Sequence, residues 1–335
     1  MLGRVTITDV ARVAGVSVAT VSKVMNGRDG VAAATFERVM SVVNELGYET
    51  SLIASSLRRR QTNVLGVLVA DFEPYSTEVL KGISEGTHGT GYQLLAYSGW
   101  AEMEPDFGWE RRSLSRLAGT LIDGAILVTP TTVMSGVSIP IVAIDPHQGH
   151  GDTPTVDSDS FAGARLATDH LIGLGHRRIA HIRGRADLES TIWRERGYCA
   201  SLEAAGIPFD PSLVLTGEYR RPDGYAAARE LLTRPEPPTA IFAANDLSAL
   251  GAIDAARELG LQVPHDLSIV GFDDIPEASS TTPRLTTVAQ PLHEMGRRAV
   301  QLLIEELTTG THAHRRIHLD ARLTIRDTTA PPRAR

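Results

Sequence analysis

From residue 63 onward, short apolar runs alternate with longer stretches in which apolar residues recur at helical spacing. Most of the runs are separated by helix-like segments such as Ser76–Thr90 and Phe161–Gly173. The runs, rich in Val and Ile, lie at Val64–Ala70, Tyr92–Tyr97, Gly124–Val128, Ile139–Ile144, Arg178–Ile182, Ala240–Ala243 and Leu267–Gly271. Strands that are apolar throughout are typical of parallel sheets covered by helices. The pattern predicts an α/β fold of doubly wound parallel sheets, and about 270 residues suit two lobes.

The first 50 residues show a different, all-helical pattern. Thr6 stands three residues before Asp9, which is a capping-box spacing at the start of a helix. Gly15 ends this helix, and Ser17 caps a second one almost at once. A third amphipathic helix is expected near Ala33–Leu46. Two helices joined by so short a glycine-containing turn form a helix-turn-helix.

Charge is distributed unevenly along the chain. The first 62 residues carry eight basic and five acidic side chains, whereas the whole chain of 335 residues has a net charge of −7. A basic head on an acidic body can contact phosphates with one end only. Cys199 is the single cysteine, which excludes an internal disulfide and fits a reducing compartment. With no secretion signal and no apolar run of about 18 residues, we expect a cytoplasmic protein without a membrane span.

The second helix carries short polar side chains on its outward side, and they can reach phosphates or base edges. A plain three-helix bundle without DNA is the alternative, and the density of these side chains speaks against it. They are Ser17, Thr20, Ser22, Lys23 and Asn26.

Two segments of the head, Asp9–Ser17 (DVARVAGVS) and Thr20–Gly27 (TVSKVMNG), make it similar to the lactose/galactose repressor (LacI/GalR) family. In that family the second helix lies in the major groove, so the resemblance assigns base reading to Val18, Ala19 and Lys23. The two apolar side chains can contact thymine methyl groups, and Lys23 can donate to guanine. The resemblance implies DNA-backbone contacts for Thr6, Ser17, Thr20, Ser22 and Asn26.

Residues 51–62 link this head to the body and contain three consecutive arginines. The segment suffices for about two helical turns, which do not persist alone in water. The resemblance implies that it folds on DNA beside its twin and inserts Leu57 into the minor groove, with Ala54 at the close approach. A basic linker without fixed structure is the alternative, and we expect that state away from DNA.

The body resembles the effector domains of the same family through Gly175–Ala180, Ala243–Asp246, Gly271–Asp274 and Leu285–Pro291. These domains are similar to periplasmic sugar-binding proteins, which have two lobes and three connecting crossovers. The crossovers are expected near 157–163, 290 and 312–319. The resulting domains are a head (1–50), a hinge (51–62) and an effector-binding and dimerisation domain (63–335), whose N-lobe is about 63–160 with 291–314 and whose C-lobe is about 161–290 with 315–330.

The ligand cleft of such a body lies at the carboxyl ends of the strands. Five residues there match ligand-contact positions of the family: Asp145, Arg194, Asn245, Asp273 and Gln290. Neighbouring candidates for shape, stacking or hydrogen bonding are Asp71, Tyr75, Trp100, Thr129, Ser190, Trp193 and Tyr219.

The mixture of carboxylates, amides and arginine in this set favours a neutral sugar as effector. A nucleobase would call for more aromatic side chains, and a phosphate for more than one arginine. Asp152, Asp157 and Asp159 lack the spacing of a calcium loop, so we expect no metal and no cofactor.

These observations predict a sequence-specific transcription regulator, expected to be a repressor, that binds palindromic double-stranded operator DNA as a homodimer. A small molecule would control it by changing the angle between the lobes, and the sign of that response stays open. No leucine heptads follow Arg326, which favours a dimer over a tetramer. A sugar-transport protein is one alternative, but it would lack the helix-turn-helix head. An α/β enzyme is another, but it would need a nucleophile elbow, a P-loop or His and Cys residues at metal-binding spacing, and the sequence has none of these. We therefore expect no catalytic residue.

Overall fold

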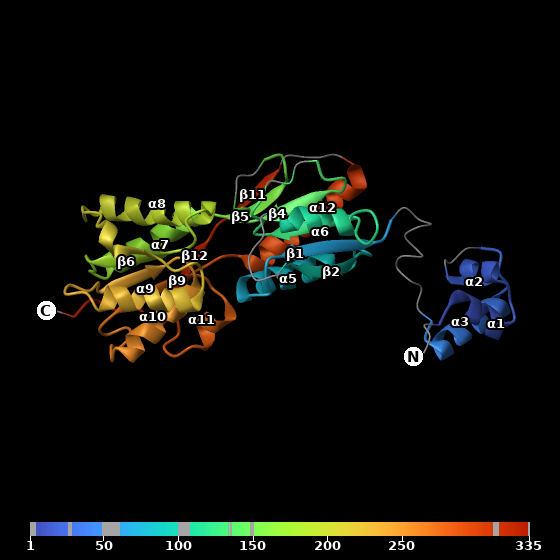
Figure 1. Ribbon diagram of the computed structural model, residues 1–335, viewed down its shortest axis with the longest axis horizontal. Helices are drawn as coiled ribbons and strands as arrows, with labels where there is room; N and C mark the ends of the chain where they lie inside the picture. Colours follow the sequence, from blue (N-terminus) through green and yellow to red (C-terminus); the bar gives the residue numbers. More distant parts are fainter. Residues whose placement is uncertain are drawn as a thin grey trace. The chain divides into compact units, whose positions relative to one another are not determined.

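A computed structural model describes residues 5–25, 29–48, 61–99, 108–132, 134, 136–147, 151–310 and 315–333. The chain divides after Thr62 into two compact units, an N-terminal head and a much larger body, and each is described by itself (Figure 1).

The head consists of three helices, α1 (Ile7–Ala14), α2 (Val18–Met25) and α3 (Ala33–Leu46). The expected capping box is present at the start of α1, where the Thr6 hydroxyl and the Asp9 carboxylate each bond the other residue's backbone N–H. Gly15 ends α1 with a left-handed backbone, φ 65°. Small and β-branched side chains fill the core, which lets short helices cross closely; they are Val10, Ala11, Ala14, Val21, Val24, Val39, Val42 and Val43.

The first lobe of the body, the N-lobe, is built on a six-stranded sheet in the order β11-β5-β4-β3-β1-β2, and all its strand pairs are parallel. Apolar residues of the central strands and of two long helices form its core. The strands are β1 (Val64–Val69), β2 (Gln93–Ser98), β3 (Gly124–Val128), β4 (Ile141–Ile144), β5 (Thr155–Ser158) and β11 (Arg316–Leu319). The helices are α5 (Pro74–Thr87), α6 (Trp109–Leu117) and α12 (Leu292–Thr309).

The second lobe, the C-lobe, has a sheet in the order β12-β10-β9-β8-β6-β7, in which only β12 is antiparallel to its neighbour. In Figure 1, α7 and α8 cover one face of this sheet and α9 and α10 the other. The strands are β6 (Ile179–Arg183), β7 (Val214–Thr216), β8 (Ala240–Ala243), β9 (Ser268–Asp273), β10 (Thr286–Ala289) and β12 (Arg322–Thr324). The helices are α7 (Ser160–Gly173), α8 (Glu189–Ala204), η1 (Pro211–Leu213), α9 (Arg221–Leu232), α10 (Asp246–Glu258) and α11 (Pro276–Ser280).

The α/β class with two parallel-sheet lobes, predicted from the sequence, is confirmed. The chain passes between the lobes after β5, after β10 and after β11. The third passage follows Leu319, at the end of the predicted range 312–319, so it comes later than the predicted lobe boundary after residue 314. Residues 315–319 were expected in the C-lobe, but β11 pairs with β5 of the N-lobe. This edge strand is fixed by ion pairs from Arg316 and His318 to Asp157, and its half-exposed residues give no apolar run to detect.

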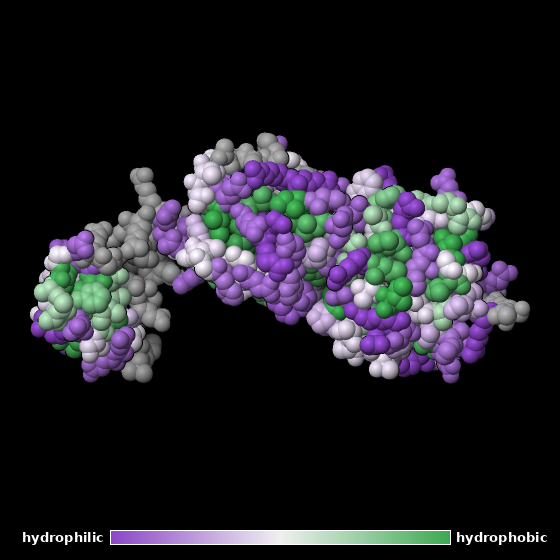
Figure 2. Space-filling view, turned by 180° about the vertical axis from the view of Figure 1, so that it is seen from behind, coloured by the Kyte–Doolittle hydropathy of each residue, from purple (hydrophilic) through white to green (hydrophobic). Residues whose placement is uncertain are grey.

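Hydrophilic side chains surround the apolar areas on the face of both lobes shown in Figure 2. Among the residues that the structure describes, no helix combines the length and the apolar character needed to cross a bilayer.

Candidate functional site

A cleft of about 500 Å³ lies between the two lobes, at the carboxyl ends of both sheets. Its walls come from both lobes, so anything bound there contacts both. Nine of the residues that the sequence singled out line it: Asp71, Tyr75, Thr129 and Asp145 from the N-lobe, and Ser190, Arg194, Tyr219, Asn245 and Asp273 from the C-lobe.

Several cleft residues have an unusual backbone. Thr129, Asp145 and Tyr219 follow strands with φ values of 49°, 48° and 60°, and Asp273 has a φ of 115°. Positive φ values are unfavourable for residues other than glycine. At these strand ends the backbone turns sharply, and the polar side chain remains in the wall of the cleft.

Arg194 forms the electrostatic centre of the cleft. Its guanidinium Nη1 lies 3.8 Å from Asp273 Oδ1, and its Cζ lies 3.8 Å from the centre of the Phe272 ring. Burial raises the pKa of Asp273 to about 7, although Arg194 and a hydrogen bond from Gln290 oppose the shift. Burial also raises the pKa of Asp145, again against the attraction of Arg194. One buried cation is thus placed near two carboxyl groups that burial makes easier to protonate.

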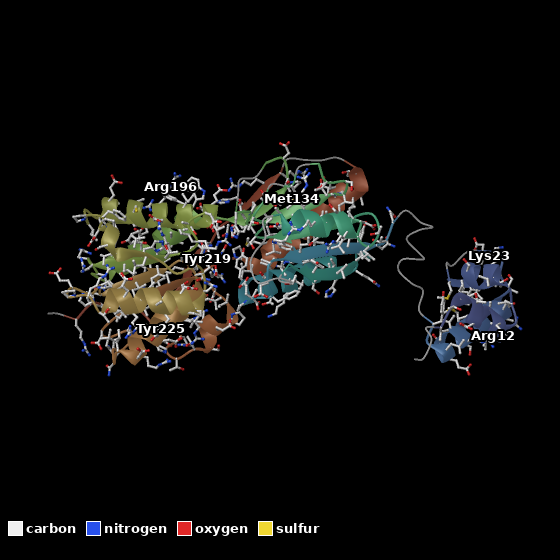
Figure 3. The ribbon with its side chains drawn as sticks, in the orientation of Figure 1. Arg12, Lys23, Met134, Arg196, Tyr219 and Tyr225 are labelled. Atoms are coloured by element: carbon white, nitrogen blue, oxygen red, sulfur yellow. The ribbon has the colours of Figure 1, made fainter. Side chains whose placement is uncertain are left out.

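Tyr219 is held by the first turn of α8. Its hydroxyl lies 3.1 Å from Ser190 Oγ and 2.9 Å from Thr191 Oγ1. A Cβ on Gly184 would come within 2.1 Å of the Tyr219 ring, so only glycine lets the ring pack against this backbone. Figure 3 labels Tyr219 on the part of the C-lobe that approaches the N-lobe. The ring is therefore fixed as one wall of the cleft.

Asn245 and Gln290 have most of their polar groups engaged within the protein. Asn245 Oδ1 caps α10 by accepting from Ser248 N at 2.9 Å, and its Nδ2 donates to the Tyr219 carbonyl at 3.0 Å. Gln290 is buried, donates to Asp273 Oδ1 at 2.7 Å and accepts from the Ser158 hydroxyl. Because Ser158 belongs to β5 of the N-lobe, Gln290 connects the two lobes and orients Asp273. Gln290 itself is not among the residues that line the cleft.

The two tryptophans singled out with the cleft have different positions. Trp193 lines a second, adjacent cavity rather than the main cleft. Trp100 lies outside the described residues and stays a prediction.

The sequence missed several cleft residues. His147, Arg185 and Arg220 line the cleft from loops, where no periodic pattern marks them. The expectation of a single arginine in the cleft is therefore wrong, although Arg185 is paired with Asp187 and Arg220 with Asp223. Burial lowers the pKa of His147 to about 4, and among the described atoms its Nδ1 is buried without a hydrogen-bond partner. Glu73 also lines the cleft and caps α5 by accepting from Ser76 N and Tyr75 N. Only Glu73 had a detectable signal, because a carboxylate directly before Pro74 is typical of a helix start.

No group of three or more His, Cys, Asp or Glu side chains that could hold a metal ion occurs in the described part of the chain.

In the head, the predicted DNA-contact residues of α2 lie on its accessible side. Ser17, Val18, Ala19 and Lys23 are exposed, while Thr20 and Ser22 are half-buried. Ser17 Oγ accepts from Thr20 N at 3.1 Å, which starts α2. Asn26, Ala54 and Leu57 lie outside the described residues, and their roles stay predictions.

Known proteins match almost the whole chain. Residues 6–51 match the model of bacterial regulatory proteins of the lacI family, and residues 168–329 match a periplasmic binding protein-like domain. The HTH-type transcriptional repressor PurR of Haemophilus influenzae is 36% identical over 332 residues, covering 96% of this chain and 97% of that protein. The chain belongs to the LacI family.

Two solved structures extend the comparison. The lac repressor dimer bound to operator and the anti-inducer ONPF superimposes with a TM-score of 0.83 at 27% identity, covering 98% of this chain and all of that one. The transcriptional regulator CelR in complex with cellobiose is 33% identical, with a TM-score of 0.72 and coverage of 97% and 100%. As a LacI-family member, the chain is a DNA-binding transcription regulator with a small-molecule effector domain.

Proposed function

We propose that this protein is a transcriptional repressor controlled by a neutral sugar bound in the interlobe cleft. The observation that carries the proposal is the placement of Arg194 beside Asp145 and Asp273 in a cleft with walls from both lobes. A carboxylate accepts from two neighbouring hydroxyls and a guanidinium donates to two, which fits the vicinal hydroxyls of a sugar. The similar regulator CelR has cellobiose bound.

A nucleobase is the alternative effector, and the lining of the cleft disfavours it. A flat base needs aromatic faces for stacking. Among the described lining residues there are two tyrosines, Tyr75 and Tyr219, and no phenylalanine or tryptophan. The hydroxyls of both are already engaged, by Asp145 and by the first turn of α8.

On DNA, we propose that α2 lies in the major groove of a palindromic operator, with a homodimer supplying one head to each half-site. The exposure of Val18, Ala19 and Lys23 supports their assignment to base reading. The lac repressor, similar over 98% of this chain, is a dimer on its operator.

An effector in the cleft can control the protein because it contacts both lobes at once. Asp273 lines the cleft and accepts from Gln290, which in turn bonds Ser158 across the lobes. A ligand that binds Asp273 more tightly at one lobe angle shifts the population toward that angle. Whether that state releases or strengthens DNA binding is decided by measuring operator affinity with and without ligand.

A thermal-shift screen of the full chain against sugars and nucleobases tests the effector class. A ligand that binds only the folded state raises the melting temperature by mass action. We expect at least one neutral sugar to stabilise the protein and to change its affinity for an operator selected from random duplexes. Stabilisation by nucleobases and by no sugar would refute the proposal.

A further inference from the structure

A second cavity of about 380 Å³ adjoins the effector cleft, beside the crossover strands β5 and β11. Asp145 and Ser190 belong to the walls of both, so the two spaces are neighbours that share a boundary. The remaining walls of the second cavity come from Pro146, β5, β11 and the N-terminal ends of α7 and α8. The contacts proposed above for the sugar all lie in the main cleft, and none of them needs the residues that line only this second space.

An aromatic side chain forms one wall of this cavity. Trp193, the fifth residue of α8, lines it and keeps 40% of its surface exposed. Its indole Nε1 donates to Glu189 Oε1 at 3.1 Å, which fixes the plane of the ring. The guanidinium of Arg196, labelled on α8 in Figure 3, lies 4.8 Å from the ring centre. Because Arg196 lies over one face of the indole, the opposite face is the one that can stack against the apolar face of a pyranose.

Hydrogen-bond acceptors are also available. Glu189 Oε2 is buried and has no partner among the described atoms, although its carboxylate lines the cavity. The cavity's two basic side chains are engaged: Arg316 donates to Asp157 Oδ2 at 2.7 Å, and His318 lies 2.6 Å from Asp157 Oδ1. A buried acceptor without a donor is unfavourable, and a ligand hydroxyl would supply the donor. Anionic ligands are disfavoured by the carboxylates of Asp145, Asp159 and Glu189.

We propose that the effector is an oligosaccharide of at least two rings. Its first ring occupies the cleft around Arg194 and Asp273, and its second ring stacks on Trp193 and donates a hydroxyl to Glu189. The inference rests on the proposed sugar effector and adds the size of that sugar and a second subsite. Because β5 and β11 end at two of the three crossovers, a second ring would also contact the segments about which the lobes move.

Calorimetry with pairs of sugars tests this subsite in the full chain. The pairs are D-glucose with cellobiose, D-glucose with maltose, and D-galactose with lactose, so each disaccharide contains its monosaccharide partner. For at least one pair we expect the disaccharide to bind at least about tenfold more tightly. In Trp193→Ala the ratio of the two affinities should fall to near one, and Trp193→Phe should restore most of it.

Ile192→Ala provides the matched control, because Ile192 is equally exposed on the same helical turn but does not line the cavity. This variant should keep the wild-type affinity ratio. Glu189→Gln, which removes the charge but not an acceptor oxygen, should reduce the ratio less than Trp193→Ala does.

The outcomes separate the two proposals. Binding of monosaccharides without any gain for a disaccharide, or equal ratios in Trp193→Ala and wild type, would overturn the second subsite and leave the sugar effector standing. If no sugar binds while a nucleobase does, both proposals are refuted.

Discussion

Arg194 and Asp273 face each other in the effector cleft as a buried ion pair, 3.8 Å apart, with only 4% and 5% of their side chains exposed. The distance is too long for a direct hydrogen bond. Arg194 instead donates to the Ala244 carbonyl, while Asp273 accepts from Gln290. The two charges are therefore held in place by the protein and can both bond to hydroxyls of a ligand between or beside them.

The first prediction concerns the carboxylate of this pair. Asp273→Asn keeps the shape of the side chain and an oxygen that can accept from Gln290, but it removes the charge. A hydrogen bond to a charged group contributes about 1.5–3 kcal/mol, so effector affinity should fall about 10- to 100-fold. Calorimetric titration with the effector measures the change, and the melting temperature verifies folding. Asp254→Asn is the control, because this carboxylate of α10 is ion-paired with Arg221 and does not line the cleft; equal affinities in both variants would remove Asp273 from the site.

The second prediction is that effector affinity depends on pH. Since burial raises the pKa of Asp273 to about 7, the carboxyl group is largely protonated below that pH. A ligand that needs the ionised form must lower this pKa on binding, so affinity is full above about pH 7 and falls as the pH decreases, by at most about tenfold per unit. Calorimetric titrations with the effector at several values from about pH 5.5 to 8.5 measure this dependence. The Asp273→Asn variant should show a flatter profile, and identical slopes would exclude this carboxyl as the titrating group.

Much of this architecture was predictable because its determinants are local in sequence. Strands such as β1 and β8 are buried on both faces, which requires apolar residues throughout and gives an unmistakable run. The head was predictable for a similar reason: the capping box of Thr6 and Asp9 and the glycine at the end of α1 specify helix ends within a few residues.

The elements that were missed depend on partners distant along the chain. β11 is an edge strand whose Arg316 and His318 pair with Asp157, about 160 residues earlier, so the strand has no apolar signature. The site shows the same limit. The resemblance to the family implied that Gln290 would lie near the ligand, but only the folded chain shows that its amide connects Ser158 to Asp273.

The third prediction concerns DNA recognition by α2. Lys23 is exposed in the last turn of this helix, and Lys23→Ala removes a donor to base edges. Loss of a base contact costs about 1–3 kcal/mol, so affinity for the selected operator should fall about 5- to 100-fold. Binding to random-sequence duplexes should weaken much less, which fluorescence anisotropy at constant salt can measure. Arg12→Ala is the control, because Arg12 lies on α1 with 74% of its side chain exposed. Equal losses on operator and random DNA would assign Lys23 to phosphate contacts.

The last prediction concerns the acid stability of the C-lobe. His181 on β6 is fully buried, with its ring stacked on Tyr198 and Phe242 at centroid distances of 5.2 and 4.8 Å. Its Nδ1 lies 3.0 Å from the Phe242 carbonyl and donates to it. Burial lowers the pKa of His181 to about 4 from an ordinary value of 6.5.

Between these two pH values the unfolded chain takes up a proton at this position that the folded chain does not. The contribution of His181 to stability is therefore full above about pH 6.5 and decreases toward pH 4, by up to about 3 kcal/mol in total. Denaturant unfolding at about pH 7 and pH 5 should show a smaller loss on acidification for His181→Phe than for wild type. The variant also loses the bond to Phe242, but that cost is the same at both pH values and cancels in the comparison. The control is His265→Phe, at an exposed histidine, which should lose as much stability on acidification as the wild type does. If His181→Phe also loses as much as the wild type, other groups determine the acid sensitivity of this lobe.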